Sequence, residues 1–98
     1  MVFKVIGSDP AIADRQDISS DIARHDPSVA QRIGRGILDH VRILASFPFI
    51  GPTYPRGSRG SLREIVFRPY RIFYDVFESP DSVEILHVWH GARGEPTF

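Results

Sequence analysis

The sequence predicts an α+β domain of two layers, in which a helical hairpin covers one face of a small, mostly antiparallel sheet. Three observations predict this fold class. A short apolar run opens the chain, and two Asp-Pro helix starts follow it. Three consecutive runs rich in β-branched and aromatic residues then alternate with short breaker segments. The expected order of elements is therefore β-α-α-β-β-β, with the helices packed on the sheet.

The composition is that of an ordinary globular chain. It has 98 residues, of which 42% are hydrophobic and 24% charged, so residues 1–98 are expected to form a single domain. The absence of cysteine excludes disulfides and cysteine-based metal sites. No apolar run is long enough to span a membrane, and no basic-then-apolar signal pattern opens the chain. We therefore expect a cytoplasmic protein without membrane contact.

The charge is balanced overall but unevenly distributed. The formal net charge is zero, which argues against a general electrostatic affinity for nucleic acid. The segment from Arg56 to Arg71 nevertheless holds five arginines and one glutamate. The segment from Asp9 to Asp26 holds five aspartates and two arginines. One part of the molecule is expected to be basic and another acidic.

The N-terminal segment predicts one strand and one helix. Val2–Ile6 is the strand, and Gly7-Ser8 ends it. Asp9 suits the N-cap and Pro10 the first helical position, so the helix is expected from about Pro10 to His25. Its apolar stripe is Ala11, Ile18 and Ile22, and its water-facing carboxylates are Asp14, Asp17 and Asp21.

A second helix begins at once, because Asp26-Pro27 repeats the start pattern. Its apolar residues recur at spacings of 3, 4, 4 and 3: Ala30, Ile33, Ile37, Val41 and Leu44. So short a link makes the two helices an antiparallel hairpin. We expect Gly34 and Gly36 to allow a close approach to the first helix.

The C-terminal half predicts a loop and a three-stranded antiparallel meander. The loop from Phe47 to Gly60 is rich in Pro and Gly, and its apolar side chains, Phe47, Phe49, Ile50 and Tyr54, are expected to anchor it. The strands are Leu62–Phe67, Tyr70–Phe77 and Val83–His90, joined by tight turns. The tail Gly94–Phe98 is expected to fray.

Strand alternation predicts which side chains share a face of the sheet. In the middle strand one face holds Arg71, Phe73, Asp75 and Phe77, and the other holds Tyr70, Ile72, Tyr74 and Val76. In the last strand one face holds Val83, Ile85, His87 and Trp89, and the other holds Glu84, Leu86, Val88 and His90. Both faces of the middle strand carry aromatic residues, which predicts an apolar patch that a partner covers.

Together, several segments of the chain resemble the RelE/ParE superfamily of bacterial type II toxins, in the branch described as plasmid-stabilisation proteins. The resemblance covers nearly the whole length, and the order and spacing of the segments carry it. They are Ala11 and Asp14 before Ile18 and Ile22, Asp26-Pro27 with Ala30, Leu44–Gly51, Leu62-Arg63-Glu64, Tyr70–Tyr74, Ile85–His90, and Arg93. The superfamily fold, a helical hairpin on a small curved sheet, agrees with the periodicity.

The resemblance implies a growth-inhibiting toxin that a cognate antitoxin neutralises in a hetero-oligomer. ParE-like members poison DNA gyrase and are not enzymes, whereas RelE-like members cut mRNA at the ribosome. We favour the ParE-like interpretation and keep a RelE-like endoribonuclease as the alternative. A third reading is a degenerate toxin retained only in a repressor complex.

If the chain were a ribonuclease, the resemblance implies a catalytic set of Arg71, Arg63, Arg93 and His90. The arginines would hold the scissile phosphate and His90 would act as acid or base, with Glu64 orienting it. Against this reading, the lysine pair and the C-terminal tyrosine of RelE-like sites are absent, since Phe98 ends the chain. Arg71 could equally be structural, paired with Glu64 or Asp75.

For partner binding, we expect contacts from Phe73, Tyr74, Phe77 and Trp89. No cofactor is expected. A metal site is not expected either, because His25, His40, His87 and His90 lack helical ligand spacing and the last two alternate across a strand. We expect His87 to be structural.

Overall fold

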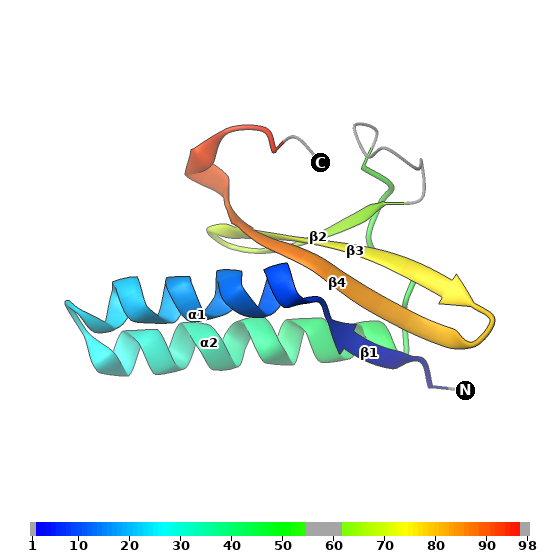
Figure 1. Ribbon diagram of the computed structural model, residues 1–98, viewed down its shortest axis with the longest axis horizontal. Helices are drawn as coiled ribbons and strands as arrows, with labels where there is room; N and C mark the ends of the chain where they lie inside the picture. Colours follow the sequence, from blue (N-terminus) through cyan, green and yellow to red (C-terminus); the bar gives the residue numbers. More distant parts are fainter. Residues whose placement is uncertain (1, 55–61, 97–98) are drawn as a thin grey trace.

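The computed structural model describes residues 2–54 and 62–96 of the chain (Figure 1). Its strands are β1 (Lys4–Gly7), β2 (Arg63–Phe67), β3 (Tyr70–Glu78) and β4 (Asp81–His90), and its helices are α1 (Asp9–Ala23) and α2 (Pro27–Arg42). Short 3-10 turns, η1 (Ile43–Ala45) and η2 (Gly91–Arg93), follow α2 and β4. This order confirms the predicted α+β fold. Among the described residues, no helix is both long enough and apolar enough to cross a membrane.

The four strands form one mixed sheet in the order β1-β4-β3-β2 (Figure 1). β2, β3 and β4 are the predicted antiparallel meander. β1, whose place the sequence left open, lies parallel to β4 at the edge, with Val5 opposite Val83. Just after β1, Ser8 donates from its hydroxyl to the Leu86 carbonyl over 3.0 Å. This bond fixes the start of α1 to the middle of β4.

The two helix starts differ from each other in detail. Asp26 is the N-cap of α2 as predicted, and its carboxylate accepts from the N–H groups of Ser28 and Val29 at 3.1 and 3.2 Å. The prediction that Asp9 caps the first helix is wrong. Ser8 takes that position, with its Oγ accepting from the Ala11 N–H over 3.2 Å, and Asp9 is already helical. The Ser8 hydroxyl also donates to the Leu86 carbonyl, so one side chain both caps α1 and joins it to β4.

The main core lies between the helical hairpin and the sheet. The predicted stripe of α2 is confirmed, since Ala30, Ile37, Val41 and the following Leu44 are buried. Ile37, Val41 and Leu44 pack against buried side chains of the sheet, and Ile33 of the same stripe is partly buried against this cluster. The sheet residues are Ile72, Tyr74, Val83, Ile85 and Val88. Gly34 faces α1 as predicted, with Ser19 nearby, but Gly36 instead lies beneath the ring of Phe67 on the sheet.

A β-bulge in β4 overturns the strict alternation predicted for that strand. Phe73 lies opposite His87 and Tyr74 opposite Ile85, so Leu86 is the extra residue. After the bulge the phase is shifted, and Val88 joins the helix-side core while Trp89 packs on the other face. The alternation of residues along one strand cannot reveal a bulge, because a bulge depends on the register between two strands.

The second face of the sheet is covered by the chain itself. Tyr54 and Leu62 bury Phe73, with Leu86 and Trp89 packed around them. Phe73 and Tyr74 are each 0% exposed, which removes both from the predicted partner contacts. Of the four side chains expected to anchor the loop after α2, only Tyr54 is buried, while Phe47, Phe49 and Ile50 are exposed. The tail expected to fray is held at least to Pro96, which is buried; residues 97 and 98 lie outside the described residues.

Two glycines provide a matched test of this packing. In Gly51→Ala the new Cβ would lie 2.5 Å from the Glu64 carbonyl oxygen and 2.7 Å from the Tyr74 hydroxyl, which accepts from the Gly51 N–H. We expect a loss of about 1–3 kcal/mol in the free energy of unfolding, measured by urea titration. In Gly34→Ala the nearest atom is 3.6 Å away, so the helix should gain up to about 1 kcal/mol. Equal effects of the two substitutions would contradict this packing.

The pH dependence of the stability of the fold above pH 8 tests the burial of Tyr70 and Tyr74. Burial raises the pKa of Tyr70 and of Tyr74 above the ordinary value of 10.0. The folded state therefore holds these protons more tightly than the unfolded state, and stability that is fully present below pH 10 is lost as pH rises through the raised values. Urea titrations from pH 8 to 11.5 should show this fall, and Tyr70→Phe should make it shallower. An identical fall in the variant would show that Tyr70 is not its source.

Candidate functional site

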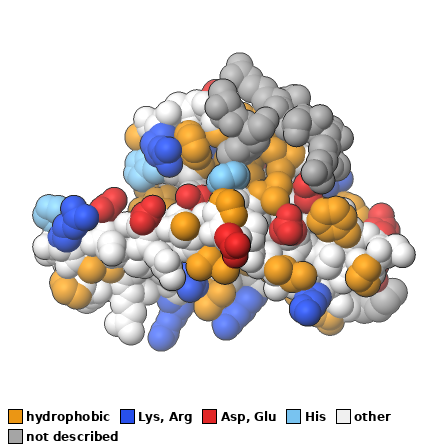
Figure 2. Space-filling view, viewed as in Figure 1, with side chains coloured by type: hydrophobic (Ala, Val, Ile, Leu, Met, Phe, Trp, Pro, Cys, Tyr) orange, Lys and Arg blue, Asp and Glu red, His pale blue; other side chains and the backbone are white. Residues whose placement is uncertain are grey.

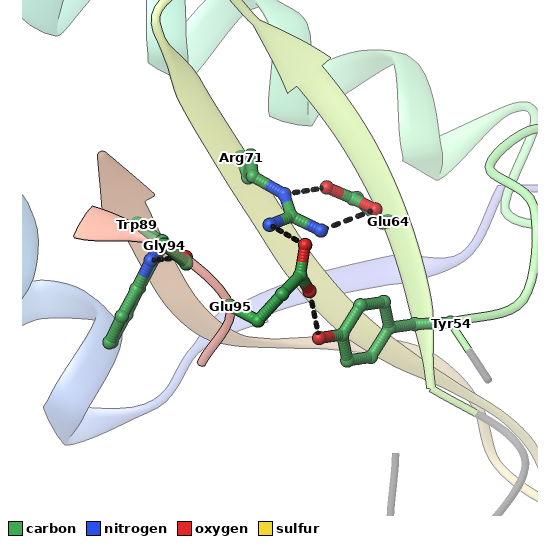
Figure 3. A network of polar contacts seen from close by, with 6 residues as sticks. All are labelled: Tyr54, Glu64, Arg71, Trp89, Gly94 and Glu95. Carbon is green, nitrogen blue, oxygen red and sulfur yellow. Dashed lines mark hydrogen bonds and ion pairs between the residues drawn. The ribbon is translucent and has the colours of Figure 1, made fainter. Parts of the chain in front are cut away.

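The guanidinium of Arg71 forms the centre of a polar network on the face of the sheet opposite the helices (Figure 3). Glu64, on the neighbouring strand β2, pairs with it through both carboxylate oxygens, one of them 3.3 Å from Nη2. Glu95, from the segment after η2, accepts from Nη1 over 3.2 Å. The second oxygen of Glu95 accepts from the Tyr54 hydroxyl over 2.6 Å. The network thus joins two strands, the loop after α2 and the C-terminal segment.

Arg71 is also enclosed by aromatic rings. Its guanidinium carbon lies 5.6 Å from the centre of the Tyr54 ring and 5.2 Å from that of Phe73. The side chains of Arg71 and Glu64 are each only 18% exposed. The hydrogen bonds with Glu64, and then the one with Glu95, raise the pKa of Arg71. Of the two partners considered for Arg71, Glu64 is the one shown, and its carboxylate is directed at Arg71 rather than at His90.

Arg63 lies on the other side of β2 and supports the loop after α2. Its Nη1 donates to the Gly51 carbonyl over 2.7 Å and to the Phe49 carbonyl over 3.4 Å. Its guanidinium carbon lies 5.0 Å from the centre of the Phe49 ring. Arg63 therefore holds backbone carbonyls on one side of the sheet while Arg71 holds carboxylates on the other.

His90 and Arg93 lie at the end of β4. His90 accepts from the Ala92 N–H through Nδ1 over 3.0 Å and so caps η2, and its ring packs edge-on against Tyr70 at 5.3 Å. Arg93 lies over the Trp89 ring, 3.8 Å from its centre. Both residues also line a groove of about 820 Å³ between α1 and this end of the sheet. The predicted catalytic set is therefore divided: His90 and Arg93 share a groove, and Arg71 and Arg63 line neither it nor a common site.

The groove is apolar at its base and acidic along its rim. Figure 2 shows a row of acidic side chains along the edge of α1 that faces the sheet. The apolar lining comes from both layers: Ile18, Ile22, Val29, Tyr70 and Val88. The carboxylates are Asp14, Asp17, Asp21 and Asp26, and among the lining residues Arg93 is the one arginine or lysine.

Asp14 does not face water as the sequence analysis expected. Its Oδ2 accepts from the Val88 N–H over 3.0 Å and lies 3.3 Å from Nδ1 of His87. His87 therefore contacts α1 rather than sharing the face of Trp89, and both His87 and His90 approach the helix side. The spacing of Asp14 from Ala11 and Ile18, three and four residues, could have placed it on the buried stripe.

The sequence analysis also missed Glu95 and the hydroxyl of Tyr54. Glu95 stands in a short segment without periodicity, so no pattern indicated its role. Of the predicted partner contacts, Phe77 is 40% exposed and Trp89 is partly buried, so their side chains stay accessible in part. Within residues 2–54 and 62–96, no three histidine, aspartate or glutamate side chains come together as metal ligands.

Comparison with known proteins identifies the family. A family model described as "ParE toxin of type II toxin-antitoxin system, parDE" matches residues 5–94. No curated protein sequence matches the chain.

Two solved structures share the fold. One is described as the chromosomal ParDE TA system from P. aeruginosa, with a TM-score of 0.76 and 17% identity over 91% of this chain and 96% of that one. The other is the toxin–antitoxin complex RelBE2 from Mycobacterium tuberculosis, with a TM-score of 0.69 and 20% identity over 92% and 99%. With the family match over most of its length, the chain belongs to the ParE toxins of type II toxin–antitoxin systems, within the RelE/ParE superfamily that its sequence resembles.

Proposed function

We propose that this ParE-type toxin inhibits growth by binding DNA gyrase in the cytoplasm, and that a cognate antitoxin neutralises it by direct contact. The observation that supports action on gyrase rather than on RNA is the pairing of Arg71 with Glu64 and Glu95. A ribonuclease needs a cation that is free to hold a phosphate, and the two carboxylates compete for this one. The Nη1 group of Arg63 likewise donates to backbone carbonyls.

The electrostatics of the groove support the same proposal. His90 is the only candidate general acid or base in the predicted catalytic set, and it lies in a groove with four aspartates. An RNA phosphate approaching His90 would meet these carboxylates, which repel it. The neutral net charge offers no compensating attraction. A toxin that acts by protein–protein contact has no such requirement.

Exposed apolar side chains support an antitoxin partner. Around η1 and the edge strand β2, five large hydrophobic side chains are between 44% and 61% exposed: Ile43, Phe47, Phe49, Ile50 and Val66. Three of them, Ile43, Ile50 and Val66, line one groove. Exposed apolar surface of this kind is typical of interaction sites. The RelBE2 structure is described as a toxin–antitoxin complex, which favours the same type of partner here.

One observation favours the ribonuclease alternative. His90 and Arg93 line the same groove, so a base and a cation do share one site. The two functions make different predictions for His90, because its ring has a structural role that asparagine can take over. An asparagine side chain can cap η2 as His90 does, but it cannot transfer a proton at neutral pH.

We therefore expect His90→Asn to retain growth inhibition when the chain is expressed alone. The same cells should show intact mRNA ends, and the purified protein should inhibit gyrase supercoiling. A ribonuclease that uses His90 as acid or base would instead lose roughly 10²–10⁴-fold in activity. Codon-phased mRNA cuts that disappear in His90→Asn would overturn the gyrase proposal and establish the alternative.

Arg71 should behave as a scaffold residue. Arg71→Ala removes the cation between Glu64, which is partly buried, and Glu95, which is half exposed, so we expect a loss of about 2 kcal/mol in the free energy of unfolding. Urea titration measures this loss. The double variant Arg71→Met/Glu64→Leu removes both charges and should recover most of it, because a buried ion pair is replaceable by apolar packing.

Growth inhibition provides the second readout for the same pair. The recovered double variant should inhibit growth again if Arg71 acts only through the fold. A stable double variant without growth inhibition would place Arg71 in the site of action.

A further inference from the structure

We infer that the groove between α1 and the end of the sheet binds a basic, amphipathic segment of the antitoxin, with Asp17 and Asp21 as its main charge contacts. The inference rests on the proposed antitoxin partner and goes beyond it by naming the surface and the chemistry of the segment. The groove, of about 820 Å³, runs beside the C-terminal half of α1. In Figure 2 it lies between the acidic edge of α1 and the end of the sheet.

The lining of the groove requires an apolar side on its occupant. Ile18 and Ile22 of α1 project one helical turn apart, and Tyr70 and Val88 of the sheet lie opposite them. Ile18 is only partly buried although it packs against the core. A segment with leucine- or isoleucine-like side chains would complete the burial of this surface, which is the largest driving force for association.

The rim of the groove requires positive charge on the same occupant. Four carboxylates and one guanidinium line it, so its field favours lysine and arginine. Two of the carboxylates are already used in the fold. Asp14 accepts from the Val88 N–H, and Asp26 caps α2, where the Ser28 hydroxyl and backbone N–H groups lower its pKa.

The other two carboxylates are available to a partner. Asp17 is exposed and makes no hydrogen bond or ion pair with any of the described residues. Asp21 makes one ion pair, with Arg24 at 3.4 Å, in which both side chains are at least 70% exposed and therefore weakly coupled. Asp17 and Asp21 are four residues apart, so they point from the same edge of α1.

These positions define the sequence of the occupant. The lining residues on α1 run from Asp14 to Ile22, about 12 Å along the helix, which a helix of about eight residues would cover. Lysine or arginine at positions i and i+4 on one side of such a helix would match Asp17 and Asp21. Apolar residues on the adjacent side would meet Ile18 and Ile22. The same charges disfavour nucleic acid in this groove.

The test compares two double variants with equal change in net charge. Asp17→Asn/Asp21→Asn neutralises the groove, and Asp39→Asn/Glu78→Gln neutralises two exposed carboxylates that do not line it. Binding of the purified cognate antitoxin to each folded toxin is measured by calorimetry at 50 and 300 mM salt. We expect the groove variant to bind roughly tenfold more weakly at 50 mM salt and to lose most of the salt dependence, and the control to match the wild type.

Each outcome separates the groove from the proposed function. Equal affinity of both variants and the wild type would overturn the groove assignment and leave the antitoxin proposal intact. No binding of the antitoxin to the wild-type chain would overturn both. Self-association of the wild type that is lost only in the groove variant, with antitoxin affinity unchanged, would make a second copy of the chain the occupant and overturn the assignment. Equal thermal midpoints of the variants verify that folding is unchanged.

Discussion

A central strand with apolar residues on both faces is the constraint on which this fold depends. β3 buries Ile72 and Tyr74 toward the helices and Phe73 toward the other side. The helical hairpin covers only one of these faces, so the second needs a different cover. The chain supplies it from a loop and from the C-terminal segment, and the Arg71 network holds these irregular pieces in place. The charge of Arg71, a candidate for phosphate binding, is therefore used to hold this cover on the sheet.

The regular part of the fold could be predicted because its determinants are local. The cap at Asp26 and the stripe of α2 depend only on residues within a few positions of each other. The bulge at Leu86 depends on two strands at once, and the anchoring of Glu95 depends on strands and a loop far away in the sequence. For the site, alternation correctly placed Arg71 on the face of Phe73. It could not show that Arg71 and Arg63 lie apart from the groove of His90 and Arg93, because their positions depend on contacts with residues distant in the sequence.

In this ParE toxin the three arginines of the predicted catalytic set are all engaged within the fold. Arg71 is bound to carboxylates, Arg63 to carbonyls and Arg93 lies over a ring. The described residues also expose apolar side chains near η1 and an acidic groove beside α1. Such surfaces recognise proteins by shape and charge. Specificity for a target and for an antitoxin could then change by substitution on the surface, without disturbing the core that both depend on.

The parallel pairing of β1 with β4 has a consequence for synthesis. Val5 pairs with Val83, and the Ser8 hydroxyl bonds to Leu86, 78 positions later in the chain. β1 therefore cannot pair until β4, the last of the four described strands, has been synthesised, and until then the helical hairpin has no complete sheet to pack on. A fold that closes only through such distant contacts is slow to form. The toxin therefore cannot complete its sheet until residues 81–90 have been synthesised.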